Sequence, residues 1–157
     1  MKKVFLLALL LLGVYPCVQA QNKSTVAVYV SGKIDDACKK IISSKAVSRI
    51  SRSDSFVALE RTDVFLETLT KEQDYQLSGE VRDDQIAELG KRLGARYVAA
   101  FEASEVDRTG FISARMIDVE SGLVIKSADM NRKINSPEDW VAITNNVAFR
   151  LVSKNSK

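Results

Sequence analysis

The chain lacks the residues that most enzyme active sites and metal sites need. Its 157 residues include no histidine and only two cysteines. Without histidine, a Ser-His or Cys-His nucleophile pair is excluded, and so is a zinc site built from a Cys/His cluster. The sequence therefore predicts no catalytic, cofactor-binding or metal-ligating residues, and no cofactor.

Adjacent carboxylates are the remaining route to acid–base chemistry. Two such pairs are Asp35–Asp36 and Asp83–Asp84. Both stand where helices are expected to begin, a place where the helix dipole favours negative charge. We interpret them as helix-start residues. A carboxylate-based hydrolase that depends on Asp83 or Asp84 is the less favoured alternative.

Long apolar runs are also missing beyond the N-terminus, where residues 1–20 have the pattern of a signal peptide. A positive start, Met1 to Lys3, precedes an apolar stretch to Val14, and small residues lead to a cleavage site after Ala20. The apolar stretch is too short to span a bilayer, so no membrane span is predicted. Two of the 23 basic residues lie in this segment, so 21 remain against 20 acids. That balance argues against nucleic-acid binding.

The two cysteines have different expected roles. Cleavage after Ala20 removes Cys17 and leaves Cys38 without a partner for an internal disulfide. We expect Cys38 to pack on the buried face of a helix; an intermolecular bridge or a redox-active thiol is the alternative. Tyr15 and Pro16 precede Cys17 where a lipoprotein signal needs small residues. Lipidation of Cys17, with peripheral membrane association, is therefore less favoured than a freely soluble exported protein.

Hydrophobic periodicity predicts one α/β domain over residues 25–153, between short tails at 21–24 and 154–157. The expected order is β-α-β-α-α-β-β-β-α, a mixed sheet of about five strands with helices packed on it. Strands are expected at 25–30, 56–59, 96–103, 111–119 and 123–130. Helices are expected at 36–52, 62–73, 83–93 and 137–153, and tight turns at 109–110 and 120–122.

Several single residues fit structural roles within this pattern. Gly94 ends a helix and Gly122 lies in a hairpin turn, both of which favour glycine. Asp118 is expected to accept hydrogen bonds from that turn. Glu60 and Arg61 follow a strand, where we favour an ion pair or a helix cap over substrate binding. Trp140 has the spacing of a core residue in the last helix, which we favour over a role as a binding anchor.

The loop Asp74–Arg82 is the first candidate for binding. It carries Tyr75 and Leu77 among polar residues, and packing onto neighbouring helices is favoured over a contact patch for a partner. Arg82 and Arg108 are further candidates for partner contact. Together with Tyr75, these arginines would suit a small-ligand or glycan site at the strand ends.

Several stretches together resemble one family. They are Phe56-Val-Ala-Leu-Glu-Arg61, Ser78-Gly79, Leu89-Gly90, Leu93-Gly94-Ala95 and Ala114-Arg-Met-Ile-Asp-Val-Glu-Ser-Gly122, in this order. The chain resembles the periplasmic domain of CsgG, the curli secretion protein, and of LpoB, the lipoprotein activator of a penicillin-binding protein. It is also similar to the N-terminal domain of TolB.

The resemblance implies a periplasmic cell-envelope protein that works by binding other proteins and is not an enzyme. The expected function is that of an adaptor or regulator, of the envelope-assembly or cell-wall-synthase type. The alternative is a periplasmic module that binds a small ligand or a glycan. The loops are too short for the transmembrane strands of a secretion pore, each of which needs about ten residues. The partner is expected to be an envelope protein, and the oligomeric state is left open.

Overall fold

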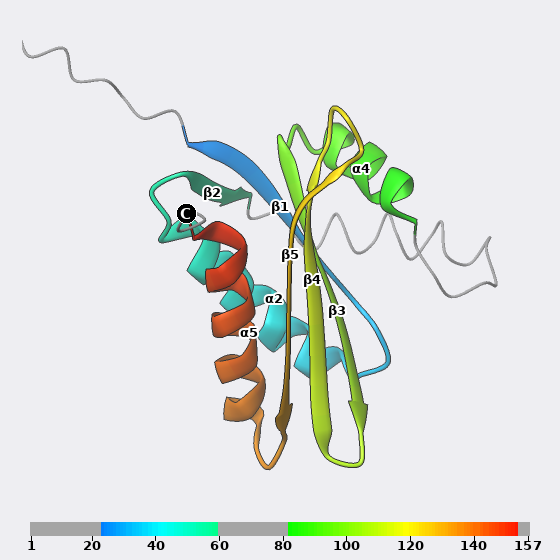
Figure 1. Cartoon of the computed structure of the whole chain (residues 1–157), viewed down its shortest axis with the longest axis vertical. Coiled ribbons are helices and arrows are strands. Elements are labelled where there is room, and N and C mark those ends of the chain that lie inside the picture. The colour runs from blue at the N-terminus through cyan, green and yellow to red at the C-terminus, as the bar shows by residue number, and fades with distance from the viewer. Residues whose placement is uncertain (1–22, 60–81, 154–157) are drawn as a thin grey trace, which may run out of the picture.

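A computed structural model describes residues 23–59 and 82–153 of the chain. These residues form five strands and three helices (Figure 1). The strands are β1 (Ser24–Ser31), β2 (Phe56–Leu59), β3 (Tyr97–Val106), β4 (Thr109–Asp118) and β5 (Val124–Lys133). The helices are α2 (Asp36–Ser51), α4 (Asp83–Arg92) and α5 (Pro137–Val152).

The strands form one mixed sheet in the order β2-β1-β3-β4-β5. β1 runs parallel to both of its neighbours, whereas β3, β4 and β5 form an antiparallel meander. Helical crossovers connect the parallel strands, as parallel pairing requires. The predicted fold, one domain with a mixed sheet of about five strands and helices packed on it, is confirmed.

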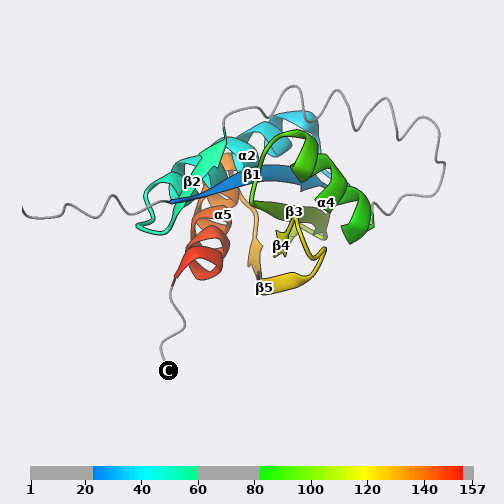
Figure 2. The same cartoon turned by 90° about the horizontal axis from the view of Figure 1, so that it is seen from above.

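Helices cover both faces of the sheet. Seen from above in Figure 2, α2 and α5 lie on one face and α4 lies on the other. The larger core fills the space under α2 and α5 and contains Phe101, Met116 and Trp140. Trp140 is only 2% exposed, which confirms its predicted place in the core. The smaller core lies under α4, around Ile86 and Val98.

Local signals explain where α2 and α5 begin. The Asp35 carboxylate accepts a hydrogen bond from the Cys38 amide at 2.7 Å and caps α2. Ser136 and Asp139 form a capping box at the start of α5, and Pro137 occupies the first turn, where its missing amide hydrogen costs nothing. Arg82, and not Asp83, is the N-cap of α4, so Asp83 lies in the first turn, where it interacts favourably with the helix dipole.

Several predicted boundaries are wrong. The turn expected at residues 109–110 lies at Asp107 and Arg108, whose φ angles are 48° and 57°. Gly110 instead lies within β4. A Cβ atom there would collide with the side chains of Ile134 and Trp140, so glycine is needed at this position for packing and not for a turn. β3 and β5 each continue three residues beyond their expected ends, to Val106 and Lys133. The helix expected at 62–73 lies outside the described residues.

Among the described helices, none combines the length and the apolar character needed to cross a membrane.

Candidate functional site

The predicted carboxylate pairs have structural contacts in the fold. Asp83 pairs with Arg115 of β4, with 3.1 Å between Asp83 Oδ1 and Arg115 Nη1. Asp84 pairs with Arg82 at 3.1 Å. Within residues 23–59 and 82–153, no group of three or more Cys, Asp or Glu side chains is arranged to hold a metal ion.

Asp118 organises the turn between β4 and β5. One of its carboxylate oxygens accepts hydrogen bonds from the amides of Glu120 at 2.9 Å and Ser121 at 3.0 Å. Its backbone amide donates to the Leu123 carbonyl, and its carbonyl accepts from the Gly122 amide. Gly122 has a φ of 69°, in the left-handed region that glycine enters without strain. The turn is thus fixed by four hydrogen bonds.

Arg96 extends this turn into an ionic cluster. Its guanidinium donates to Asp118 at 3.0 Å and to Glu120, and it also lies 5.6 Å from the centre of the Tyr97 ring. The amide donors of Ser121 and Glu120, together with the charge of Arg96, hold the pKa of Asp118 below its ordinary value. The hydrogen bond to Glu120 and the neighbouring carboxylates raise the pKa of Arg96. Both groups are therefore charged near neutral pH.

Three exposed apolar residues follow this turn. Leu123, Val124 and Ile125 are 65%, 42% and 48% exposed, and we call them the turn patch. Val124 pairs with Ile117 of β4, and the register of the two strands is irregular beside Ile117, which leaves Ile125 outside the regular pairing. The patch lies at the start of β5, at one edge of the sheet. Adjacent exposed apolar side chains bordered by charges are typical of a surface that contacts another molecule.

The structure does not bring the predicted binding arginines together. Arg82 caps α4 next to Asp83, which contacts Arg115. Arg108 stands in the turn between β3 and β4, seven residues along the strand from Arg115, or about 23 Å at the rise of a β-strand. A single ligand site that uses both arginines is therefore disfavoured.

Arg108 has apolar neighbours of its own. Val106 and Phe111, on either side of it in sequence, are 59% and 41% exposed. Tyr75 and Leu77, the other predicted contact residues, lie outside the described residues, as do Glu60 and Arg61. Their roles stay predictions.

Gly94 and Gly90 fix how α4 meets the sheet. Gly94 follows α4 with a φ of 70°. Its amide donates to the Lys91 carbonyl, and the next amide, of Ala95, donates to Gly90. A Cβ atom at Gly90 would lie 2.4 Å from the Val98 side chain. Gly90 therefore allows α4 to pack closely on the sheet, and Gly94 allows the left-handed turn that ends α4.

Cys38 is half-buried against the larger core. Burial raises the pKa of its thiol to about 11, and the nearby Asp35 carboxylate adds to the effect. A thiol with so high a pKa is protonated and weakly reactive near neutral pH.

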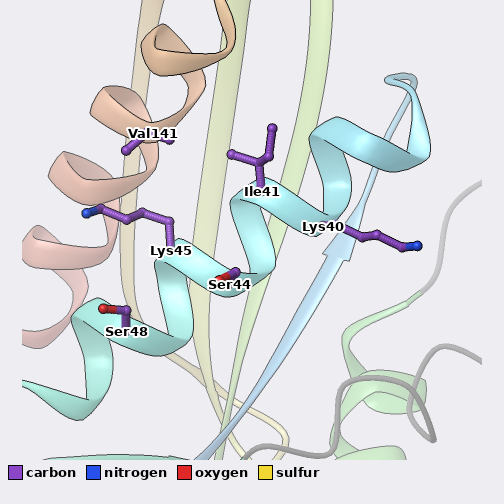
Figure 3. Close-up of a pocket in the computed structure, with 6 residues that line it drawn as sticks. All are labelled: Lys40, Ile41, Ser44, Lys45, Ser48 and Val141. Atoms are coloured by element: carbon purple, nitrogen blue, oxygen red, sulfur yellow. The ribbon is translucent and has the colours of Figure 1, made fainter.

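An open groove runs between α2 and α5 on the outer side of the helical layer. It is lined by Lys40, Ile41, Ser44, Lys45, Ser48 and Val141. Figure 3 shows the Lys45 side chain extending toward α5 and Val141, whereas Lys40 points away from that helix. The two lysines thus do not converge on one ligand position.

Comparison with known proteins shows which solved structures have a similar fold. No family model and no curated protein matches the chain. The PelC dodecamer from Paraburkholderia phytofirmans aligns with a TM-score of 0.56 and 15% identity, over 87% of this chain and 91% of PelC. Lipoprotein GNA1162 from Neisseria meningitidis gives a TM-score of 0.51 and 15% identity, over 72% of this chain and 82% of GNA1162.

TolB from Acinetobacter baumannii gives a TM-score of 0.50 and 13% identity, over 83% of this chain and 28% of TolB. This chain has a TolB-like fold. The fold predicted from the sequence resemblance, which included TolB, is thereby confirmed.

Sequence reasoning missed the turn patch. The run Leu123-Val124-Ile125 has the composition of an ordinary buried strand. Its exposure depends on the position of β5 at the sheet edge, and the only signal in the sequence is that this run is continuous and not alternating.

Proposed function

We propose that this chain is an exported cell-envelope protein that acts by binding another protein, as an adaptor or regulator and not as an enzyme. The turn patch is the observation that carries the proposal. Its three adjacent apolar side chains are 42–65% exposed and are bordered by the ionic cluster of Arg96, Asp118 and Glu120. An apolar centre with a charged rim is the usual arrangement of a protein–protein interface.

The hydrogen bonds of the turn support this proposal. They hold the backbone on which the patch stands before any partner arrives, so binding does not have to order this segment. A preformed apolar surface of this kind suits a partner with a complementary apolar groove.

The sequence and the structural neighbours agree with an envelope role. Residues 1–20 have the pattern of a signal for export. GNA1162 is a lipoprotein, and PelC forms a dodecamer. We infer a periplasmic location for this chain, with an anchor at Cys17 as the less favoured alternative. Within that location, regulation of envelope assembly or of a cell-wall synthase is the finer role that we propose.

Photocrosslinking in living cells tests the proposal. A photoreactive amino acid replaces Leu123 in the chain expressed with its own signal segment, and the matched control replaces Asn146, an exposed polar residue of α5. We expect illumination to attach a specific protein to position 123 and not to position 146. Equal crosslinking at both positions, or none at 123, would remove the turn patch as the docking surface.

A further inference from the structure

The outer edge of β5, on the side away from β4, is a second surface that could contact another chain. β5 is ten residues long and ends the sheet on one side, whereas β2 on the other side has four residues. Figure 2 shows α5 beside one face of β5, and within the described residues no further strand pairs with its outer edge. An edge strand presents unpaired amide and carbonyl groups that can pair with a further strand.

Asp129 shows which residues of β5 direct their backbone outward. Its carbonyl accepts a hydrogen bond at 3.3 Å from Nη1 of Arg150, a residue of α5, so this oxygen points away from β4, and Arg150 would have to release it when a further strand pairs here. Backbone groups alternate in direction along an antiparallel strand, so those of Asn131 and Lys133 also point outward. The pairing with β4 is regular here, with Asp129 opposite Ser113 and Lys133 opposite Thr109.

The side-chain charges along this part of β5 are complementary to those of a second, antiparallel copy of β5 in one register. Asp129 and Lys133 are exposed and share one face of the sheet. They lie about 13 Å apart along the strand, too far to pair within one chain. Neither has an ion-pair partner among the residues that the structure describes. In a two-fold arrangement centred on Asn131, Asp129 of each copy lies opposite Lys133 of the other.

We propose that two copies of this chain pair through β5, antiparallel and with the two-fold axis at Asn131, which joins their sheets into one. A register centred on Asp129 would set Asp129 against itself and Lys126 against Arg132, and like charges directly opposite are destabilising. Of these two registers, the charge pattern favours the one centred on Asn131, which sets opposite charges against each other. This pairing goes beyond the proposed function, and because it uses the end of β5 away from the turn patch, either can fail without the other.

Charge reversal tests the pairing. Sedimentation velocity over a concentration series measures the mass of the full chain, purified from a host that exports it. We expect a doubling of the mass with concentration in the wild type. Asp129→Lys and Lys133→Asp should each weaken the dimer at least tenfold, because each creates two like-charge contacts. The double variant Asp129→Lys/Lys133→Asp restores the opposite charges and should restore the dimer.

The control Asp54→Lys reverses an exposed charge in the turn after α2 and should leave the dimer unchanged. A wild type that is monomeric throughout, single variants that still dimerise fully, or a double variant that stays monomeric would each overturn the proposal. Melting temperatures of all variants show whether any loss of the dimer reflects loss of the fold.

Cysteine crosslinking tests the register itself. In a chain carrying Cys38→Ser, Asn131→Cys places two thiols across the axis at a Cα separation of about 5.5 Å, within the range of a disulfide. Ser127→Cys on the same face would lie eight residues from its counterpart, about 27 Å away. We expect oxidation to crosslink Asn131→Cys and not Ser127→Cys. The reverse result, or crosslinking of neither, would overturn this register.

Discussion

Replacing Gly110 with alanine tests how tightly α5 packs on the sheet. A Cβ atom at Gly110 would lie 2.8 Å from Cδ1 and Cγ1 of Ile134 and 2.9 Å from Cη2 of Trp140. Carbon atoms prefer contacts of about 3.5–4.0 Å, so each neighbour would have to move by nearly 1 Å. Overpacking costs about 1–3 kcal/mol, whereas removing a glycine from a strand regains about 0.5–1 kcal/mol. We expect a net loss of about 1–2 kcal/mol in the free energy of unfolding.

Urea unfolding followed by tryptophan fluorescence measures this change, because Trp140 is the single tryptophan of the chain and is almost fully buried. Ile134→Ala provides the matched background, since it removes two of the three close contacts. In that background we expect Gly110→Ala to cost less than about 0.5 kcal/mol, a coupling of the size that contacting residues show. An equal cost in both backgrounds would refute the packing argument.

Two further predictions concern the turns. Gly94→Ala should cost about 1–2 kcal/mol, because its φ of 70° strains any side chain while its Cβ would meet nothing within 4 Å; Gly94→Asn should cost less, and thermal unfolding compares the two. Folding lowers the pKa of Asp118. The ionised carboxylate therefore stabilises the fold fully above the unfolded pKa of about 3.9, and this stabilisation is lost as the pH falls through the folded-state pKa. The difference in melting temperature between the wild type and Asp118→Asn should therefore be constant from pH 7 to pH 5 and shrink below pH 4; a constant difference down to pH 2 would contradict this role of the carboxylate.

The sequence predicts those elements of the fold that depend on local signals. Ser136 and Pro137 mark the start of α5, and the strand Phe56–Leu59 has the predicted bounds. The turn after β3 was misplaced because Gly110 suggests a turn, whereas Asp107 and Arg108 adopt positive φ angles that side chains rarely take. The pairing of β3 with β4 sets these φ angles, and no local sequence pattern predicts where that pairing turns.

The candidate site is harder to predict because exposure depends on tertiary structure. Val98 and Val124 are both apolar strand residues, yet Val98 is fully buried and Val124 is 42% exposed. The difference comes from their strands: β3 lies inside the sheet and β5 lies at its edge. The order of strands in space, and not their composition, decides which apolar residues can meet a partner.

The turn patch also differs from the core in its expected contribution to stability. Full burial of a leucine or isoleucine side chain is worth about 1.5–3 kcal/mol, and Leu123 and Ile125 keep 65% and 48% of their surface exposed. Replacing either with serine should thus cost at most about half of that value. Ile117→Ala, at a fully buried position beside them, should cost about 2–5 kcal/mol.

The most direct test of the proposed function is the affinity of the double variant Leu123→Ser/Ile125→Ser for the protein captured at position 123. If the turn patch is the docking surface, the dissociation constant rises at least about tenfold, the loss expected when apolar anchors are removed. The melting temperature should fall far less than it does in Ile117→Ala. An unchanged dissociation constant in a folded double variant would contradict the claim that this protein acts through the turn patch.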